Sequence, residues 1–356
     1  MDKMNIKNLR EKIDGVDKKI VEFLNSRAMI TKDIAQLKIK KGVSVYSPDR
    51  EREVLNKLTV INKGPLSCRA LEAIYREVMS ASFSLGKKLR IAYLGPEASF
   101  THLAALKRFG SQVEYIALDS ITDVFLRVEK GEADFGVVPI ENSIEGAVSH
   151  TMDMFVDSDL KICAQIILDV SHNLLSNYLK GQIKRVYSNP QVFGQCRSWL
   201  QENLPAVEKI EVSSTTRAAQ IAVKEKYSAA IASLLASKVY KLKVVCPDIE
   251  DSSQNATKFF VIGKSDANQT ANDKTSILFS IKDKVGALHE MLLPFKKYRI
   301  NLTKIESRPS KKKAWDYYFF IDLEGHKNSP CVKKALFELD NKCKFLKILG
   351  SYPAGE

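Results

Sequence analysis

The sequence lacks the features that define several classes of protein. It contains no apolar run of the roughly 18 residues that a transmembrane helix needs, and its first residues, MDKMNIKNLREKIDG, contain no apolar segment typical of a secretory signal peptide. Its six cysteines are scattered, with no C-x-x-C pair to indicate a zinc site or a redox motif. Scattered cysteines in a long chain are typical of reduced thiols, so we expect a cytoplasmic protein with no membrane partner.

The sequence also lacks a recognisable nucleic-acid-binding motif, although its net charge is +13. The charge is uneven, since residues 1–88 carry 19 Lys and Arg against 11 Asp and Glu, residues 89–272 carry 19 against 21, and residues 273–356 carry 17 against 10. The basic residues are not interleaved with aromatic side chains as in nucleic-acid-binding modules. Small anionic substrates explain basic pockets equally well, so we predict no nucleic-acid partner.

The 356 residues, 45% of them hydrophobic and 27% charged, are typical of a globular protein with two or three domains. Over residues 5–41, apolar residues recur at steps of three and four, which predicts one long helix. Two more helices are predicted over residues 48–62 and 66–85. Three helices cannot bury so long a first helix within one chain, so residues 1–88 predict an all-α domain that forms an intertwined dimer.

After residue 89 the pattern changes to short β-rich runs that alternate with helical stretches. This alternation predicts an α/β domain over residues 89–265, built as two lobes with a cleft between them. The polar segment 264–274 predicts a linker. Residues 275–356 have the order β-α-β-β-α-β, which predicts a ferredoxin-like α+β domain.

Residues 5–86 resemble the all-helical chorismate mutase family, through LREKID at 9–14, DRERE at 49–53 and single basic and serine positions. The spacing of Arg27 and Lys38 alone is equally compatible with a solvated helix face. The resemblance implies that arginines bind the two carboxylates of chorismate. It also implies that one of these arginines belongs to the partner subunit. The implied mutase residues are Arg10 (from the partner), Arg27, Lys38 near the ether oxygen, Arg50, Glu51 at the substrate hydroxyl, and Ser82.

The mutase reaction is a pericyclic rearrangement, so catalysis consists of positioning and of electrostatic stabilisation at the ether oxygen. Lys38 and Glu51 are the candidate catalytic residues. The family places Gln or Glu four residues after the position of Ser82, where this chain has Gly86. Losing one donor to a developing oxyanion costs about 10²–10³ in rate in other enzymes, which predicts a slow mutase.

The central region resembles prephenate dehydratases, through five motifs in the family's order and spacing. They are AYLGPEASFTHLAAL at 92–106, GVVPIENSIEGAVSHTMD at 136–153, SNPQVFGQCRSWL at 188–200, SSTTRAA at 213–219 and IEDSSQNATKFFVIG at 249–263. The resemblance implies a two-lobed fold like that of periplasmic binding proteins. It also implies conversion of prephenate to phenylpyruvate, in which a ring hydroxyl departs and needs a proton donor.

The resemblance implies that Thr257 supplies or relays this proton. Side chains implied to line the same cleft and orient the substrate are Glu141, Asn142, Ser143, Ser188, Gln195, Ser214 and Thr215. Phe259 is implied to shape the pocket. The family's Thr-Arg-Phe is Thr-Lys-Phe here, so Lys258 is expected to hold a substrate carboxylate without a bidentate fork.

The C-terminal region resembles the ACT regulatory domain of prephenate dehydratases, through KDKVGALHE at 282–290 and NLTKIESRPS at 301–310. The resemblance implies a phenylalanine site at Gly286, Ala287, Leu288, Glu306, Ser307 and Arg308. Together the three regions resemble bifunctional chorismate mutase/prephenate dehydratases under phenylalanine feedback, acting on chorismate and prephenate as a homodimer or larger oligomer. No metal-ligand cluster or phosphate loop is present, so we predict no cofactor. The alternatives are a dehydratase with a vestigial mutase and a non-catalytic amino-acid sensor.

Overall fold

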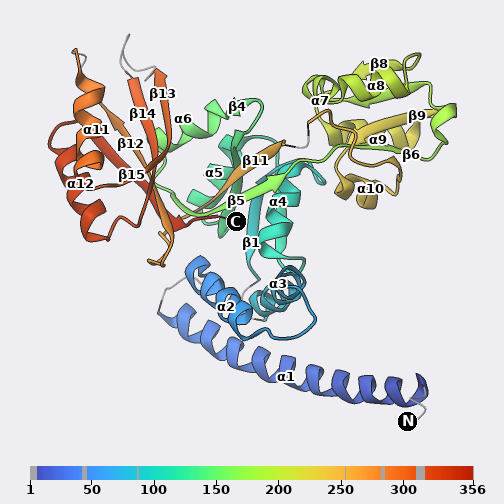
Figure 1. Cartoon of the computed structure of the whole chain (residues 1–356), viewed down its shortest axis with the longest axis horizontal. Coiled ribbons are helices and arrows are strands. Elements are labelled where there is room, and N and C mark those ends of the chain that lie inside the picture. Colours follow the sequence, from blue (N-terminus) through green and yellow to red (C-terminus); the bar gives the residue numbers. More distant parts are fainter. Residues whose placement is uncertain are drawn as a thin grey trace. The chain divides into compact units, whose positions relative to one another are not determined.

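The computed structural model describes residues 6–41, 46–85, 88–252, 254–281, 285–309 and 317–355 (Figure 1). The chain divides into two compact units, one of residues 1–89 with 109–114 and the other of residues 90–108 with 115–356. Within the described ranges, no helix has the length and apolar content to cross a membrane.

The N-terminal unit contains α1 (Ile6–Lys40), α2 (Pro48–Ile61) and α3 (Cys68–Ser84). A proline in the first turn begins α2, and the Ser67 hydroxyl caps α3 by accepting the Ala70 N–H at 3.1 Å. Along α1, only Ala35 is buried, while apolar side chains such as Ile13 and Phe23 are 57% and 73% exposed. The chain therefore leaves one side of a 35-residue apolar helix uncovered.

The first lobe of the second unit is built on a six-stranded mixed sheet. Its strand order is β2-β1-β3-β11-β5, with β4 paired to β3. The elements are β1 (Arg90–Leu94), α4 (Phe100–Phe109), β2 (Glu114–Leu118), α5 (Ile121–Glu129), β3 (Phe135–Asn142), β4 (Gly146–Ala147), α6 (Ser149–Asp157), β5 (Lys161–Asp169) and β11 (Ala256–Gly263).

The second lobe has its own five-stranded sheet, in the order β10-β6-β9-β7-β8. Its elements are β6 (Asn173–Ser176), the 3-10 turn η1 (Lys180–Gln182), β7 (Arg185–Ser188), α7 (Pro190–Gln195), α8 (Arg197–Asn203), β8 (Glu208–Glu211), α9 (Thr215–Lys224), β9 (Ser228–Ala232), α10 (Leu234–Tyr240) and β10 (Lys243–Cys246). The chain passes between the lobes twice, at residues 170–172 and again at 247–255.

The C-terminal part forms an antiparallel sheet in the order β13-β14-β12-β15. Its elements are β12 (Asp273–Ser280), α11 (Ala287–Lys297), β13 (Leu302–Pro309), β14 (Tyr317–Glu324), α12 (Pro330–Asp340) and β15 (Phe345–Pro353). Both helices pack on one face of this sheet, where Phe295 and Leu336 meet Phe279 and Ile321 (Figure 1). Trp315, where the sequence places the start of a strand, lies outside the described residues.

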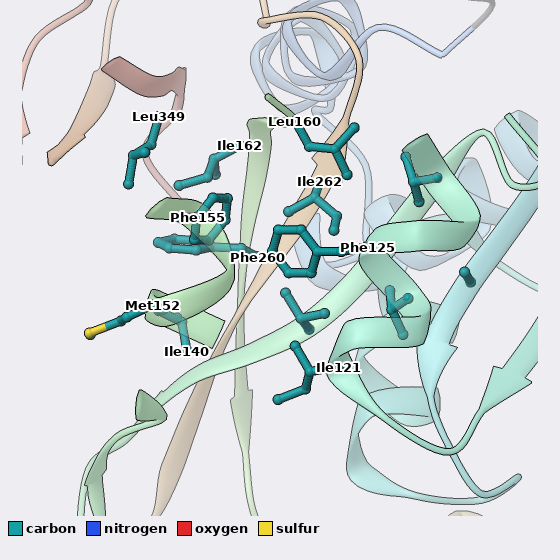
Figure 2. Packing of buried hydrophobic residues seen from close by; sticks show 14 of the residues in the cluster. Ile121, Phe125, Ile140, Met152, Phe155, Leu160, Ile162, Phe260, Ile262 and Leu349 are labelled. Atoms are coloured by element: carbon teal, nitrogen blue, oxygen red, sulfur yellow. The ribbon is translucent and has the colours of Figure 1, made fainter. Parts of the chain in front are cut away.

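The other face of the C-terminal sheet shares a core with the first lobe. Leu349 packs in one buried cluster with Phe155 of α6 and with Ile162 and Phe260 of the first lobe's sheet (Figure 2). Tyr352 belongs to the same cluster. The two sheets approach closely, because a Cβ added at Gly350 would lie 2.3 Å from the Ile162 carbonyl oxygen. The C-terminal sheet is therefore part of the same hydrophobic core as the first lobe.

The segment 264–274, which the sequence predicts as a linker, connects β11 to β12 and contacts the C-terminal sheet. Its Asp266 carboxylate forms an ion pair with Lys327, Ala267 is buried, and β12 already begins at the buried Asp273. Its polar groups form hydrogen bonds and an ion pair with polar groups of the C-terminal region.

Candidate functional sites

A cavity of about 720 Å³ lies within the N-terminal unit, between α1, α2 and α3. Five of the six predicted mutase residues line it, namely Arg27, Lys38, Arg50, Glu51 and Ser82. Its other lining residues are Phe23, Ser26, Ile30, Thr31, Ile34, Ala35, Ser47, Val54, Met79 and Phe83. The cavity thus combines three cations and one carboxylate with an apolar wall, which suits a small cyclic dianion.

The cations of this cavity are held in different ways. Arg27 Nη1 donates to Ser82 Oγ at 2.9 Å, and that hydroxyl in turn donates to the Val78 carbonyl at 2.8 Å. Burial lowers the pKa of Lys38, and the nearby Asp49 carboxylate opposes this only in part. Arg50 is more exposed and forms an ion pair with Glu53 at 2.5 Å. Arg27 is thus positioned by a neighbour, and Lys38 is only partly hydrated.

Arg10 does not line this cavity. It lies seventeen residues before Arg27 on the same helix, which is about 25 Å at 1.5 Å of rise per residue. A substrate the size of chorismate cannot span that distance, so Arg10 does not serve the cavity of its own chain. Gly86, where the sequence predicts a lost donor, lies outside the described residues.

In the second unit, β3 and β11 bring the predicted dehydratase residues together in antiparallel register. Asn142 lies opposite Thr257, and Glu141 lies opposite Lys258. Directly opposed residues have neighbouring side chains, and successive residues of a strand point to opposite faces. The first pair therefore lies on one face of the sheet and the second pair on the other.

The Asn142 side chain contacts the Thr257 hydroxyl directly, since Nδ2 donates to Oγ1 at 2.8 Å. Asn142 Oδ1 accepts the backbone N–H groups of Ile144 and Glu145 at 2.9 and 3.0 Å. The Thr257 oxygen is thus an acceptor toward Asn142, so its own proton points elsewhere.

Glu141 and Lys258 have partners on the opposite face. Glu141 Oε2 lies 2.9 Å from Lys258 Nζ and 3.2 Å from Nζ of Lys304, which comes from β13 of the C-terminal sheet. Burial by itself would raise the pKa of Glu141, but the two ammonium groups lower it below its usual value. The expectation that Lys258 holds a substrate carboxylate beside Thr257 is not matched by this placement, because adjacent strand residues face opposite ways.

The remaining predicted cleft residues have structural contacts of their own. Ser188, at the end of β7, is fully buried and donates to the Ile231 carbonyl at 3.0 Å. Ser214 caps α9 by accepting the Arg217 N–H at 3.1 Å, and Thr215 is the first residue of that helix.

Two more predicted residues belong to the first lobe. Ser143 joins the loop after β3 to residues 254–256, because its hydroxyl donates to the Gln254 carbonyl and accepts the Ala256 N–H. Phe259 is 1% exposed within β11. Both side chains support the strand pair that carries Asn142 and Thr257.

The six predicted effector residues fall on two sides of the C-terminal sheet. Gly286, with φ of 77°, caps the start of α11, whose first residues Ala287 and Leu288 lie on the helix-covered side. Ser307 is exposed, and alternation places it on the opposite side of β13 from Glu306 and Arg308.

Arg308 contacts the first lobe. Its Nη1 donates to Ser149 Oγ at 2.6 Å, and its Nη2 lies 3.3 Å from an Asp153 carboxylate oxygen. Ser149 and Asp153 both belong to α6, so part of the predicted effector motif contacts the first lobe.

Sequence reasoning missed three polar residues around Asn142. Asn255, which precedes β11, accepts a hydrogen bond from Asn142 at 2.8 Å and donates one to Gln195 at 3.0 Å. His172 lies 2.8 Å from the same Gln195 oxygen, and Glu145 accepts from Gln195 at 3.3 Å. Of these three residues, Asn255 could have been identified from the sequence, because it is the asparagine of the N-A-T-K-F motif.

A second cavity, of about 380 Å³, borders this cluster. Its lining includes the carboxyl groups of Glu145, Glu250 and Asp251, which disfavour a dianion there. Among the residues that the structure describes, no group of three or more His, Cys, Asp or Glu side chains is placed to bind a metal ion.

Three family models match the chain in succession. Chorismate mutase type II matches residues 9–87, prephenate dehydratase matches residues 91–267, and the ACT domain matches residues 275–341.

The similar proteins give the same picture over the whole length. A bifunctional chorismate mutase/prephenate dehydratase of Aquifex aeolicus is 50% identical over 353 residues, which cover 98% of each chain. One of Pseudomonas aeruginosa is 42% identical over 99% of this chain and 98% of its own. The crystal structure of the Arthrobacter aurescens prephenate dehydratase in complex with L-Phe has a TM-score of 0.70 at 31% identity, over 75% of this chain and 90% of that one.

Proposed function

Because the chain belongs to the family of bifunctional chorismate mutase/prephenate dehydratases, we propose which of its residues carry each reaction. The enzyme rearranges chorismate to prephenate and then converts prephenate to phenylpyruvate, with loss of CO2 and water. The cavity at α1–α3 is assigned to the first reaction and the face of β3 and β11 that carries Asn142 and Thr257 to the second. Incubating the purified protein with chorismate, and following both prephenate and phenylpyruvate, tests both assignments together.

For the mutase, the proposal is supported by the gathering of five predicted residues around one cavity. Arg27 and Arg50 bind the carboxylates of chorismate, and Glu51 accepts its hydroxyl proton in a hydrogen bond. Lys38 lies at the ether oxygen, where negative charge develops as the bond breaks. An ammonium group in a poorly hydrated cavity stabilises that charge more than it would in water.

The alkaline limb of mutase activity should follow Lys38. Because burial lowers the pKa of this ammonium, it loses its proton at a lower pH than an exposed lysine does. As the pH rises, we therefore expect kcat/KM for chorismate to fall at a lower pH than it would if Lys38 had the pKa of an exposed lysine. In Lys38→Arg the alkaline fall in kcat/KM should move beyond the pH at which the enzyme can be assayed, because the guanidinium group stays protonated. An unchanged limb in Lys38→Arg would exclude Lys38 as its source, and the dehydratase profile of the same samples is the control.

For the dehydratase, one observation carries the proposal, namely the 2.8 Å hydrogen bond from Asn142 to the Thr257 hydroxyl. Since Asn142 is the donor, the Thr257 proton is directed to another acceptor. That acceptor is the departing ring hydroxyl of prephenate, which leaves as water once it is protonated. Loss of CO2 supplies the electron pair that makes the ring aromatic, so the protein needs only one proton donor and a sheltered orientation of the substrate.

We place phenylalanine feedback in residues 275–355, whose fold we assign as ferredoxin-like from the β-α-β-β-α-β order and the sheet order β13-β14-β12-β15. The Glu141 carboxylate links this sheet to the catalytic strands, because it contacts both Lys304 and Lys258. Glu141 and Lys258 are the immediate neighbours of Asn142 and Thr257. A shift of β13 on effector binding would therefore move Asn142 and Thr257 through the ion pair between Lys304 and Glu141.

Lys304→Met should weaken this coupling. Removing the ammonium leaves Glu141 paired with Lys258 alone, so we expect the ratio of dehydratase activity without and with phenylalanine to fall at least about fivefold. Direct binding of phenylalanine, measured by calorimetry, should persist. Lys333→Met, at an exposed position of α12, is the matched control. Feedback of parental strength in Lys304→Met would contradict this route.

The exposed apolar side of α1 supports a homodimer in which the two first helices cover each other. A cytoplasmic location fits the six cysteines, none of which forms a disulfide.

A further inference from the structure

Four residues next to Thr257 form a closed ring of hydrogen bonds in which each donates to the next. Asn142 Nδ2 donates to Asn255 Oδ1 at 2.8 Å, Asn255 Nδ2 donates to Gln195 Oε1 at 3.0 Å, and Gln195 Nε2 donates to Glu145 Oε1 at 3.3 Å. The backbone N–H of Glu145 closes the ring by donating to Asn142 Oδ1 at 3.0 Å. Along the three side-chain amides each donation polarises the next group, which strengthens the chain of hydrogen bonds from Asn142 to Glu145.

The ring leaves the Asn142 amide only one orientation. Its Oδ1 accepts two backbone N–H groups, from Ile144 and Glu145. Turning the amide over would bring its NH2 against these donors and its oxygen against the Asn255 Oδ1 oxygen. The Nδ2 group is therefore fixed toward the Thr257 hydroxyl.

The ring also joins the two segments through which the chain crosses between the lobes. Asn255 ends the second crossing and is 2% exposed, and His172 lies in the first crossing and is 1% exposed. His172 Nε2 lies 2.8 Å from Gln195 Oε1, the same oxygen that accepts from Asn255. An oxygen has only lone pairs to offer, so His172 must contribute an N–H at Nε2. Burial lowers the pKa of His172, although the hydrogen bond with Gln195 and the nearby Glu250 carboxylate oppose this shift.

We propose that Asn255 is a positioning residue for the dehydration, supported by His172. The backbone N–H groups of Ile144 and Glu145 set which way the Asn142 amide faces, and Asn255 accepts one of its two Nδ2 hydrogens, so that the other stays on the Thr257 hydroxyl. This directs the Thr257 proton toward the departing hydroxyl. His172 holds the Gln195 carbonyl to which Asn255 donates. The inference rests on the proposed role of Thr257 as proton donor.

Two variants at Asn255 test the proposal in the full-length enzyme. Asn255→Ala removes the partner of Asn142, and Asn255→Asp keeps the shape but sets an oxygen against Gln195 Oε1. We expect kcat for prephenate to fall about ten- to a hundredfold in both, with KM changed less than about threefold. Mutase turnover of the same samples reports the amount of chain with an intact N-terminal unit. Asn173→Ala is the matched control, because Asn173 is also buried, at the start of β6, and lies outside the ring.

A double-mutant comparison distinguishes positioning from a general loss of structure. In an Asn142→Ala background, Asn255→Ala should cause little further loss, because Asn255 acts through Asn142. His172→Gln, which retains a donor near the Nε2 position, should keep more activity than His172→Phe. Parental kcat in both Asn255 variants, or losses that multiply with that of Asn142→Ala, would overturn the inference. If Thr257→Val instead keeps the parental rate, the assigned proton donor itself fails, whatever the Asn255 variants do.

Discussion

Thr257→Ala and Thr257→Val are expected to lower dehydratase turnover by about 10²- to 10⁴-fold, the usual contribution of a positioned proton donor. Valine matches the shape of threonine and suits a strand, so β11 should keep its register while the hydroxyl is lost. Thr257→Ser keeps the hydroxyl and should retain most of the turnover. The measurement is phenylpyruvate formation from saturating prephenate.

The mutase activity of the same protein is the internal control for Thr257. The residues that line the mutase cavity all belong to α1–α3 and the segment joining α1 to α2, and Thr257 is not among them. Chorismate should therefore be consumed at the parental rate while prephenate accumulates. A Thr257→Val enzyme that makes phenylpyruvate within about threefold of the parental rate would remove Thr257 from the mechanism, since a lost proton donor costs far more.

The sequence predicts the helices of the N-terminal unit to within two residues at each end, because their apolar periodicity is long and proline or serine marks two of their starts. The mutase residues are implied by the family resemblance and not by spacing, and the structure places five of the six around one cavity between those helices. The strand pair of β3 and β11 is different, since it joins Asn142 to a residue more than a hundred positions away. No local pattern specifies such a register.

Two further features had a signal that the sequence analysis did not use. Thr257 and Lys258 are adjacent in a strand, so they cannot both face one cleft. In β12, Ile277, Leu278 and Phe279 are consecutive apolar residues, which indicates a strand covered on both faces. The second face of this strand packs against the first lobe, in the buried cluster that contains Leu349 (Figure 2).

The shared core also changes how feedback must be tested. Truncation after Asp266 would remove Leu278, Phe320, Leu349 and Tyr352 from the cluster that contains Phe260. The catalytic lobe would then expose a large apolar surface, so lost inhibition would accompany lost stability. Point variants such as Lys304→Met in the full chain avoid this.

Mixed dimers of Arg10→Ala and Arg27→Ala are expected to recover mutase activity that neither variant has alone. Each single variant should lose about a hundredfold or more, because a carboxylate of bound chorismate is left without its partner in a desolvated site. Arg27 lines the cavity of its own chain, while Arg10 is about 25 Å along the helix, so in the proposed homodimer we assign Arg10 to the partner's cavity.

In a dimer with one copy of each variant, one site receives an intact Arg27 and an intact Arg10, and the other site lacks both. Random pairing makes half of the dimers mixed, so about a quarter of the parental activity should return. Co-expression of two differently tagged chains, followed by tandem purification of the mixed dimer, should raise this to about half. A double variant Arg10→Ala/Arg27→Ala paired with the parent chain is the control, because each site then lacks one arginine and activity stays low. Parental mutase activity in Arg10→Ala alone would contradict a shared site, since α1 would then complete its cavity without a second chain.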